Sequence, residues 1–298
     1  MDNKLIEIFN KIINDKYKTN KHKKYYSNEY YLINIFEMLN DINKWNSLAK
    51  LKTYNPVLIN NNKSKSHYDT IRKKFIKWSK DNIFKLAFQE CLNLKSINND
   101  IELIIDSTFI NNKYGIEDIG LNTDNKKKRA SKLSIISDKD KFIYSVINIK
   151  INNRINKDEF KNKNKNNINK CKKSKNKKKR KGFIHDVKTI QSTLDCINTK
   201  YNFKNITLLG DKGYINKNEN YYFNGKKIYL ITYKKKNQKS NNNEDENKLK
   251  KRIYVENPIG LIKKNERIMT RKDHKIKSYM GFVYLGCLIN NLKIIQKL

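Results

Sequence analysis

Apolar residues recur at three- and four-residue spacing along the first third of the chain. This spacing places them on one face of a helix and predicts amphipathic helices. The expected helices lie at 3–13, 28–42, 66–80 and 81–94. We expect Asp81 to cap the last of them. Residues 1–96 are therefore predicted to form an all-helical N-terminal region.

From residue 101 the pattern changes to short runs of apolar, β-branched residues, which predict strands. Three consecutive strands, expected to be antiparallel, lie at 101–110, 132–138 and 141–151. An amphipathic helix at 185–197 and two further strands at 205–211 and 227–234 come next. Closing helices are expected in the remaining C-terminal segment. This order predicts an α/β domain with a mixed sheet over residues 97–298.

Two polar segments interrupt this domain. Residues 161–181 contain twelve basic residues and no acidic ones, and residues 237–248 are a polar, low-complexity stretch. Both are expected to be mobile loops. The basic segment fits a role in tracking phosphates or in nuclear import, and it fits equally well an expanded loop with neither role.

The composition bounds the class of protein. The chain has 298 residues, 37% of them hydrophobic, which is enough for a buried core. No run approaches the roughly 18 apolar residues that a membrane helix needs, and the N-terminus lacks the pattern of a signal peptide. The four cysteines lie far apart and are expected to be reduced. We therefore expect a protein that is not secreted and has no membrane partner, cytoplasmic in a bacterium or nuclear in a eukaryotic host.

The charge indicates a partner. Lys and Arg number 66 against 29 Asp and Glu, which gives a net charge of +37. Such a surplus favours a polyanion, because binding releases condensed counterions. A/T-rich codons account for part of the surplus, because they enrich Lys together with Asn, Ile and Tyr. They do not account for all of it, because Asp and Glu codons also tolerate A and T, and these two residues are not enriched to the same extent. Nucleic acid is the expected partner.

One group of basic residues lies opposite the aromatic stripe of the helix expected at 66–80. Its members are Arg72, Lys73, Lys74 and Lys77. Together with the following helix they fit a small helix-turn-helix unit that reads DNA, and residues 1–96 are accordingly expected to be a DNA-binding region. A solvated basic face explains them equally well.

Three carboxylates carry the candidate chemistry. Asp106 and Asp211 each end an apolar strand, where rigid backbone can hold them at a sheet edge to bind a divalent cation. Glu256 is flanked by basic residues. Each alone is typical of a turn, a cap or a surface salt bridge. Together they provide the hard oxygen ligands that phosphoryl transfer with two Mg²⁺ or Mn²⁺ ions requires.

These residues resemble the motifs of DDE transposases of the bacterial-type insertion-sequence class. The matching motifs are IIDST with Asp106, GDKGY with Asp211, and the Y-x2-R-x3-E-x6-K pattern with Arg252, Glu256 and Lys263 at the required spacing. The resemblance extends over residues 65–295. It implies a catalytic domain with an RNase H-like mixed sheet flanked by helices.

The resemblance also implies roles and partners. Asp106, Asp211 and Glu256 would hold two Mg²⁺ or Mn²⁺ ions, while Arg252 and Lys263 would contact DNA phosphates near the cut. The implied partners are double-stranded DNA, at the element ends and at the target, and a second copy of the chain in a homodimer on DNA.

Three further residues belong to this comparison. Lys212 is either another phosphate contact or a turn residue. His185 and Asp186 resemble a His–Asp pair found in many such enzymes. For this pair we expect helix capping by Asp186 and packing by His185 rather than metal binding.

The sequence departs from the family pattern at two positions. Leu249 stands where the pattern has Tyr, so a role of that tyrosine in shaping the DNA end, including through a hairpin intermediate, is not carried over. Pro258 follows Glu256 by two, and proline inside a helix costs about 3 kcal/mol unless it lies in the first turn. We therefore expect Glu256 at the start of its helix, with Gly260 weakening that helix.

The leading hypothesis is a transposase that cleaves DNA at element ends and joins the 3′-hydroxyls to target DNA. A second hypothesis, motivated by Leu249 and Pro258, is a catalytically silent DNA-binding protein derived from a transposase. A third is a simple RNase H-like nuclease. Metal-dependent cleavage distinguishes the first from the second, and strand joining distinguishes it from the third.

Overall fold

A computed structural model of the chain provides the structure. It describes residues 3–17, 27–40, 45–50, 57–59, 62–64, 67–95, 100–122, 128–151, 182–197, 200–201, 203–215, 220–233 and 243–297. The basic segment 161–181 and Cys171 lie outside the described residues, as do residues 237–242 of the expected polar loop. Cys91, Cys196 and Cys287 are free thiols. Among the described helices, none combines the length and apolar character needed to cross a bilayer.

The N-terminal region is helical, as predicted. Its helices are α1 (Asn3–Lys16), α2 (Asn28–Asn40), the 3₁₀ helix η1 (Trp45–Lys50), α3 (Tyr68–Lys80) and α4 (Ile83–Leu92). It is not all-helical, because β1 (Val57–Ile59) and β2 (Asn62–Ser64) form an antiparallel hairpin. The apolar run at β1 is only three residues long, too short to show a helical period.

The expected cap at Asp81 is wrong. Asn82 precedes α4 and makes no side-chain capping bond, whereas Asp81 ends α3. The carboxylate of Asp81 instead accepts a hydrogen bond from the hydroxyl of Tyr17. Only two residues separate α3 from α4, and Asp81 is the residue that ends α3. Its side chain therefore connects the end of α3 to Tyr17, just after α1.

The sheet has the mixed topology that was expected. Its strands are β3 (Asp100–Asn112), β4 (Gly120–Leu121), β5 (Arg129–Ser137), β6 (Ile143–Asn148), β7 (Asn205–Gly210), β10 (Tyr229–Thr232) and β11 (Thr270–Arg271). β3, β5 and β6 are antiparallel neighbours, while β7 and β10 run parallel to β3 on its other side. The order β10-β7-β3-β5-β6 is that of an RNase H-like sheet. A separate hairpin joins β8 (Tyr222–Phe223) to β9 (Lys226–Lys227).

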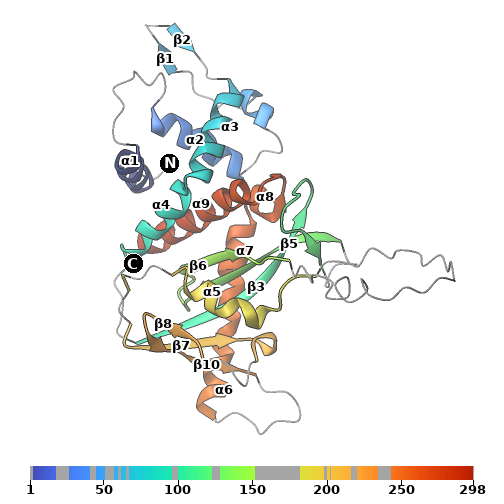
Figure 1. Cartoon of the computed structure of the whole chain (residues 1–298). Coiled ribbons are helices and arrows are strands. Elements are labelled where there is room, and N and C mark those ends of the chain that lie inside the picture. The colour runs from blue at the N-terminus through green and yellow to red at the C-terminus, as the bar shows by residue number, and fades with distance from the viewer. Residues whose placement is uncertain are drawn as a thin grey trace, which may run out of the picture.

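Helices cover both faces of this sheet (Figure 1). The helix expected at 185–197 is shorter, with the 3₁₀ helix η3 (Asp186–Thr189) and α5 (Ile190–Leu194). Thr193 of α5 contacts Ser134, which pairs with Ser107 of β3, so α5 lies on that face. Thr108 follows Ser107 on β3, so its side chain lies on the opposite face of the sheet. There it contacts Lys263, in the helical C-terminal third of the chain.

The C-terminal third is helical as expected. Its elements are α6 (Asn243–Lys250), the 3₁₀ helix η5 (Lys251–Val255), α7 (Glu256–Lys263), α8 (Glu266–Met269) and α9 (Ile276–Ile295). The expected loop is therefore wrong over 243–248. Acidic residues in the first turn of α6 and lysines in its last turn complement the helix dipole, and Leu249 is fully buried and anchors its end.

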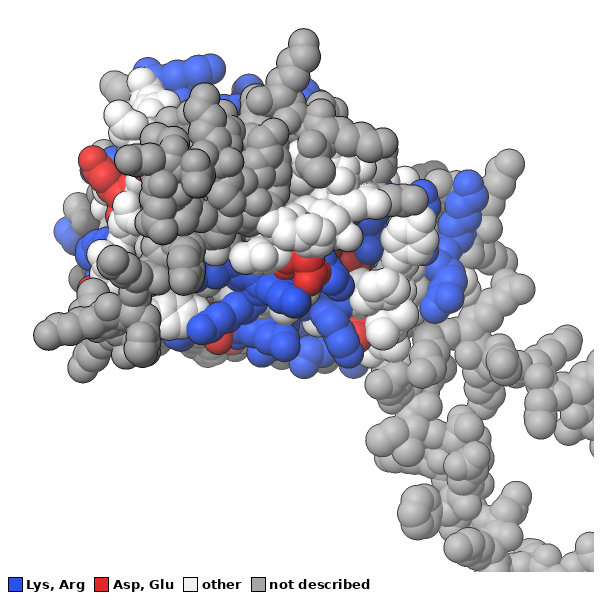
Figure 2. Space-filling view, turned by 90° about the horizontal axis from the view of Figure 1, so that it is seen from above, with Lys and Arg blue, Asp and Glu red and all other residues white. Residues whose placement is uncertain are grey.

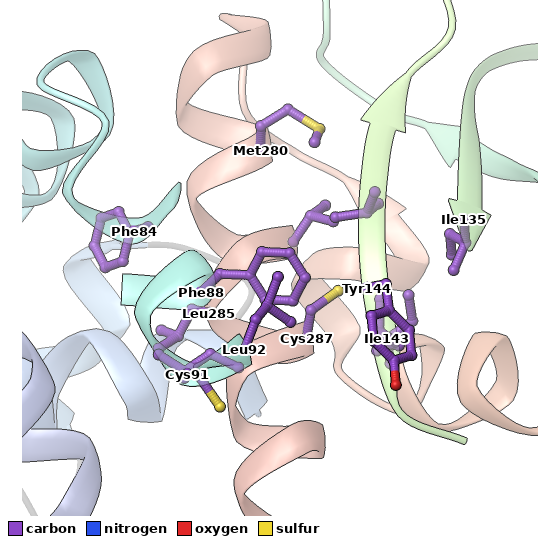
Figure 3. Close-up of a cluster of buried hydrophobic side chains, with 14 of the residues drawn as sticks. Phe84, Phe88, Cys91, Leu92, Ile135, Ile143, Tyr144, Met280, Leu285 and Cys287 are labelled. Carbon is purple, nitrogen blue, oxygen red and sulfur yellow. The ribbon is translucent and has the colours of Figure 1, made fainter. Parts of the chain in front are cut away.

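Helix α9 joins the two regions. It buries side chains on all sides, as expected for a helix that is apolar all round. Phe88 and Leu92 of α4 pack on one side of it, and Ile143 and Tyr144 of β6 lie on the other (Figure 3). The N-terminal helices and the sheet therefore share one hydrophobic core.

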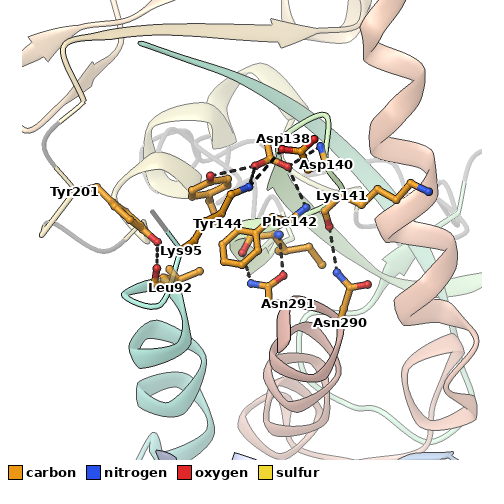
Figure 4. A network of polar contacts seen from close by, with 11 residues as sticks. Leu92, Lys95, Asp138, Asp140, Lys141, Phe142, Tyr144, Tyr201, Asn290 and Asn291 are labelled. Atoms are coloured by element: carbon orange, nitrogen blue, oxygen red, sulfur yellow. Dashed lines mark hydrogen bonds and ion pairs between the residues drawn. The ribbon is translucent and has the colours of Figure 1, made fainter. Parts of the chain in front are cut away.

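A polar network reinforces this junction (Figure 4). Lys95, just after α4, forms a buried ion pair with Asp138 in the turn between β5 and β6. Asp138 also accepts hydrogen bonds from the hydroxyl of Tyr144 at 3.1 Å and the backbone N–H of Phe142 at 3.0 Å. The Asp138 carboxylate therefore has an ion-pair partner and several hydrogen-bond donors, which a buried charge requires.

Asn291 of α9 pairs with the edge of β6. Its side chain accepts from the N–H of Ile143 at 2.9 Å and donates to the C=O of the same residue at 2.8 Å. The side-chain amide of Asn291 therefore pairs with the backbone of Ile143 as a neighbouring strand would. Ile143 is completely buried, so its N–H and C=O need these partners.

We expect Asn291→Ala to lower the free energy of unfolding by about 2 to 4 kcal/mol, because two buried backbone groups lose their partners. Urea denaturation at equilibrium measures the change. Asn290→Ala is the matched control, because it removes one bond, to the C=O of Lys141 at 3.1 Å, and should cost about 1 kcal/mol. Equal losses in the two variants would contradict this role of Asn291.

Two helical glycines should respond oppositely to alanine. No atom lies within 4 Å of a Cβ built on Gly260 of α7, whereas one on Gly281 of α9 would meet Ser79 Oγ at 2.5 Å. Gly260→Ala should raise the free energy of unfolding by about 0.5 to 1 kcal/mol, because alanine favours the helix. Gly281→Ala should lower it, because α3 and α9 pack closely there. Thermal unfolding of both variants checks this contrast.

Candidate active site at two aspartates on neighbouring parallel strands

The sheet brings Asp106 and Asp211 together. β3 and β7 are parallel, and Ile104 pairs with Leu209 at the end of their register. Two residues further along, Asp106 lies beside Asp211, the first residue after β7, whose backbone is still extended. The expectation that Asp106 ends its strand is wrong, because β3 continues to Asn112 and stays paired with β5 beyond Asp106. Side chains alternate between faces and neighbouring strands lie about 4.8 Å apart, so the two carboxylates share one face at adjacent positions.

Local backbone fixes both side chains. The carboxylate of Asp106 accepts from the N–H of Ser107, and that of Asp211 accepts from the N–H of Gly213, each at 2.7 Å. Asp211 thereby caps the 3₁₀ helix η4 (Lys212–Tyr214). Both residues are partly exposed.

The electrostatics of Asp106 are those of a crowded acidic site. Burial is the main cause that raises the pKa of Asp106 from 3.8 to about 6. The negative charges of Asp211 and Asp186 act in the same direction, and the Ser107 N–H and the Arg252 guanidinium oppose them. Asp106 is therefore destabilised in its charged form, a condition that a bound cation relieves.

The segment from η5 to α7 supplies basic groups to the same face. Lys251 pairs with Glu102 of β3 at 2.7 Å, and the charge of Arg252 acts on Asp106. Lys263, at the end of α7, donates a hydrogen bond to the hydroxyl of Thr108. Burial lowers the pKa of Lys263, and the charge of Asp106 opposes this shift.

Thr108 is a site residue that the sequence analysis missed. It lies two positions after Asp106 on the same strand, and the strand period of two places both side chains on one face. That alternation was the signal that could have identified it.

Glu256 occupies the start of α7, as the position of Pro258 predicted. Pro258 is the third residue of this helix and is buried, so it lies in the first turn where proline is tolerated. Helical spacing places Glu256 on the same edge of α7 as Lys263, two turns after it. Glu256 is exposed there. Arg252 lies four residues before Glu256, in the 3₁₀ helix η5.

The two aspartates fit a divalent cation as hard oxygen donors whose charges destabilise each other. Within the described part of the chain, however, no three acidic, histidine or cysteine side chains lie close enough together to hold a metal ion. Metal binding by all three residues stays a prediction.

The expected roles of His185 and Asp186 are wrong. His185 is exposed rather than packed. Asp186 does not cap its helix, because Lys132 of β5 donates to both of its carboxylate oxygens, at 2.6 and 2.8 Å. Asp186 instead contributes negative charge near Asp106 and raises the pKa of that residue.

The remaining basic candidates lie on two elements, η4 and α3. Lys212 is exposed in η4, directly after Asp211. On α3, which packs against α9, Arg72 and Lys73 pair with Asp69 at 3.1 and 2.9 Å, and Lys77 lies over the ring of Tyr17 at 4.9 Å. Lys and Arg side chains gather on the face viewed from above in Figure 2. DNA binding by these residues stays a prediction.

Comparisons with known proteins support the fold. No protein-family model and no curated protein matches the sequence. Among solved structures, a piggyBac transposase in a synaptic complex with hairpin DNA, determined by cryo-EM, is similar to the chain with a TM-score of 0.52. The two are 10% identical, and the match covers 100% of this chain and 73% of that chain. The fold is therefore transposase-like, whereas membership of the insertion-sequence class stays a prediction.

The raised pKa of Asp106 predicts a pH-dependent effect of Asp106→Asn. The folded state binds the proton more tightly than the unfolded state between pH 3.8 and about 6, so ionised Asp106 destabilises the fold increasingly as pH rises through this range. In metal-free buffer, the asparagine variant should be more stable than wild type by about 1 to 3 kcal/mol at pH 7.5 and nearly equal at pH 4.

Urea unfolding at both pH values measures this difference. Asp195→Asn, an exposed position at the end of α5, is the control with the same loss of charge. An equal effect of Asp106→Asn at both pH values would show that its cause is not ionisation.

Proposed function

We propose that this chain is a metal-dependent transposase that cleaves DNA and transfers the cut strand. The observation that carries the proposal is the placement of Asp106, within β3, beside Asp211, directly after the parallel strand β7, in an RNase H-like sheet. A net charge of +37 supports a nucleic-acid substrate.

Each site residue has a role in this proposal. Asp106 and Asp211 would hold Mg²⁺ or Mn²⁺, and Glu256 would supply the third carboxylate from the edge of α7 that also carries Lys263. Such ions would supply activation of the attacking water or 3′-hydroxyl and stabilisation of the leaving oxygen. The protein therefore needs no nucleophilic side chain of its own.

The basic residues hold the substrate. Arg252 places a positive charge near Asp106, which limits repulsion between the carboxylates and a DNA phosphate. Lys263 is positioned by Thr108 on the same face, and Lys212 is exposed directly after Asp211. We propose that all three contact phosphates on either side of the cut.

The similar fold of the piggyBac transposase supports DNA as the substrate, because that protein was observed in a synaptic complex with hairpin DNA. We propose that this chain likewise acts on double-stranded element ends, joins them to a target as a homodimer, and belongs to the insertion-sequence class. A hairpin is not part of the proposal, because Leu249 is fully buried at the position where the family pattern has tyrosine.

A silent DNA-binding protein is the second candidate. The observation in its favour is that the described residues do not bring three metal-binding side chains together. Such a protein would bind DNA at the same basic groups without cutting it.

Asp211→Asn should abolish Mg²⁺- or Mn²⁺-dependent cleavage and joining of a DNA that carries the gene with its own flanks, because it removes a ligand charge and keeps the shape of the side chain. Its affinity for that DNA should stay within a few-fold of wild type. Gel analysis of cut and joined products over a metal titration measures the activity, and a filter-binding assay measures the affinity.

Asp195→Asn, which loses the same charge outside the site, should retain wild-type activity. Full activity of Asp211→Asn would exclude the proposed site. Binding without cleavage by wild type would favour the silent protein, and cleavage without joining would favour a simple nuclease.

A further inference from the structure

A groove lined by lysines lies between α7 and the C-terminal half of α9, outside the carboxylate site. Its volume is about 840 Å³. Lys141, Lys264, Lys293 and Lys297 line it together with apolar residues that include Leu261 and Ile289. Lysine stems can lie along such apolar surface while their ammonium groups stay in water.

The charges of this groove are not neutralised locally. The four lysines are exposed and come from three elements, the β5–β6 turn, α7 and α9 with its C-terminal end. In the described part of the chain, none of them forms an ion pair. One carboxylate, Asp140, also lines the groove, and it lies 3.7 Å from Lys95. A concave surface with this charge attracts a polyanion.

Lys141 adopts a conformation that lysine disfavours. Its φ is +70°, in a turn position that glycine usually occupies, and the left-handed region costs other residues about 1 to 2 kcal/mol. Its N–H donates to the C=O of Asp138, and its own C=O accepts from Asn290 of α9. Its side chain extends away from the buried Asp138 network (Figure 4). Strain of this kind is characteristic of functional positions.

Helix α7 is the wall that the groove shares with the carboxylate site. Lys263 contacts Thr108 on the site side, and the next residue, Lys264, lines the groove. A helix with its side chains is about 10 to 12 Å across, and duplex DNA advances about 3.4 Å per base pair. A duplex held at the carboxylates therefore reaches the near side of the groove, at Lys264, about three to four base pairs away.

We propose that this lysine groove binds the phosphate backbone of the duplex whose cleavage site lies at Asp106 and Asp211. The inference rests on the proposed function and adds a second contact surface to it. The groove positions the flanking DNA, and it contains no catalytic residue.

Two triple variants with equal loss of charge test this assignment. The groove variant carries Lys141→Gln, Lys293→Gln and Lys297→Gln, and leaves Lys264 intact because it adjoins Lys263. The control variant carries Lys128→Gln, Lys204→Gln and Lys227→Gln, three exposed lysines that do not line the groove. Circular dichroism and thermal unfolding confirm that both variants fold.

Binding of a random-sequence 30-base-pair duplex is measured over a salt titration. Each lost phosphate contact should reduce the slope of log K against log salt by about 0.9, so the groove variant should lose roughly 2 to 3. The control variant should lose much less. Equal slopes for the two variants would overturn the inference.

Acetylation of lysines in the wild-type protein, followed by mass spectrometry, is the second measurement. Saturating duplex should slow the modification of Lys141, Lys293 and Lys297 several-fold relative to the three control lysines. Unchanged reactivity would overturn the inference and make an acidic peptide the occupant to test.

Cleavage assays separate the two proposals. If wild type cleaves with metal but the variants bind alike, only the groove assignment fails. If DNA protects the groove lysines but wild type never cleaves, the proposed catalysis fails and the groove stands as a DNA-binding surface.

Discussion

Burial of α9 is the constraint on which the rest of the structure depends. This helix is apolar on every side, so it is stable only when protein surrounds it. The N-terminal helices cover one side and β6 the other, with Asn291 satisfying the exposed backbone edge of that strand. The same packing fixes where α7 and α8 lie, because both contact α9. The position of the helix that carries Glu256 therefore follows from the hydrophobic core.

The sheet creates the opposite situation where the parallel pairing of β3 and β7 ends. There, the register of the two strands places Asp106 and Asp211 side by side at the border of an apolar layer. Burial and the charge of Asp211 disfavour the charged form of Asp106, and its pKa is raised as a result. The charge of Arg252 partly offsets this cost, and binding of a cation by the two aspartates stays a proposal.

The many lysines of the chain differ in what they contact. Lys95 and Lys132 are largely buried in ion pairs, and Lys73 is paired on the surface of its own helix. Such lysines stabilise local structure or contribute little. Those around the groove between α7 and α9 have no ion-pair partner in the described part of the chain, and one of them occupies a strained turn position. Net charge alone cannot separate these groups, because it counts each lysine equally.

The sequence by itself determined the helices and strands whose apolar period is long and regular, including α1, α3, the three antiparallel strands and β7. It also singled out Asp106 and Asp211 as candidates, because an acidic residue after an apolar run is conspicuous in a basic chain, but it placed Asp106 at a strand end, whereas the structure places it within β3. Pro258 fixed the start of α7, since proline tolerates only the first turn. Only the tertiary structure decided the partners of Asp81, Asp186 and Thr108, because hydrogen bonds and ion pairs of this kind join residues far apart in the chain. It also decided that two aspartates 105 positions apart are neighbours, since strand register depends on the packing of the whole sheet.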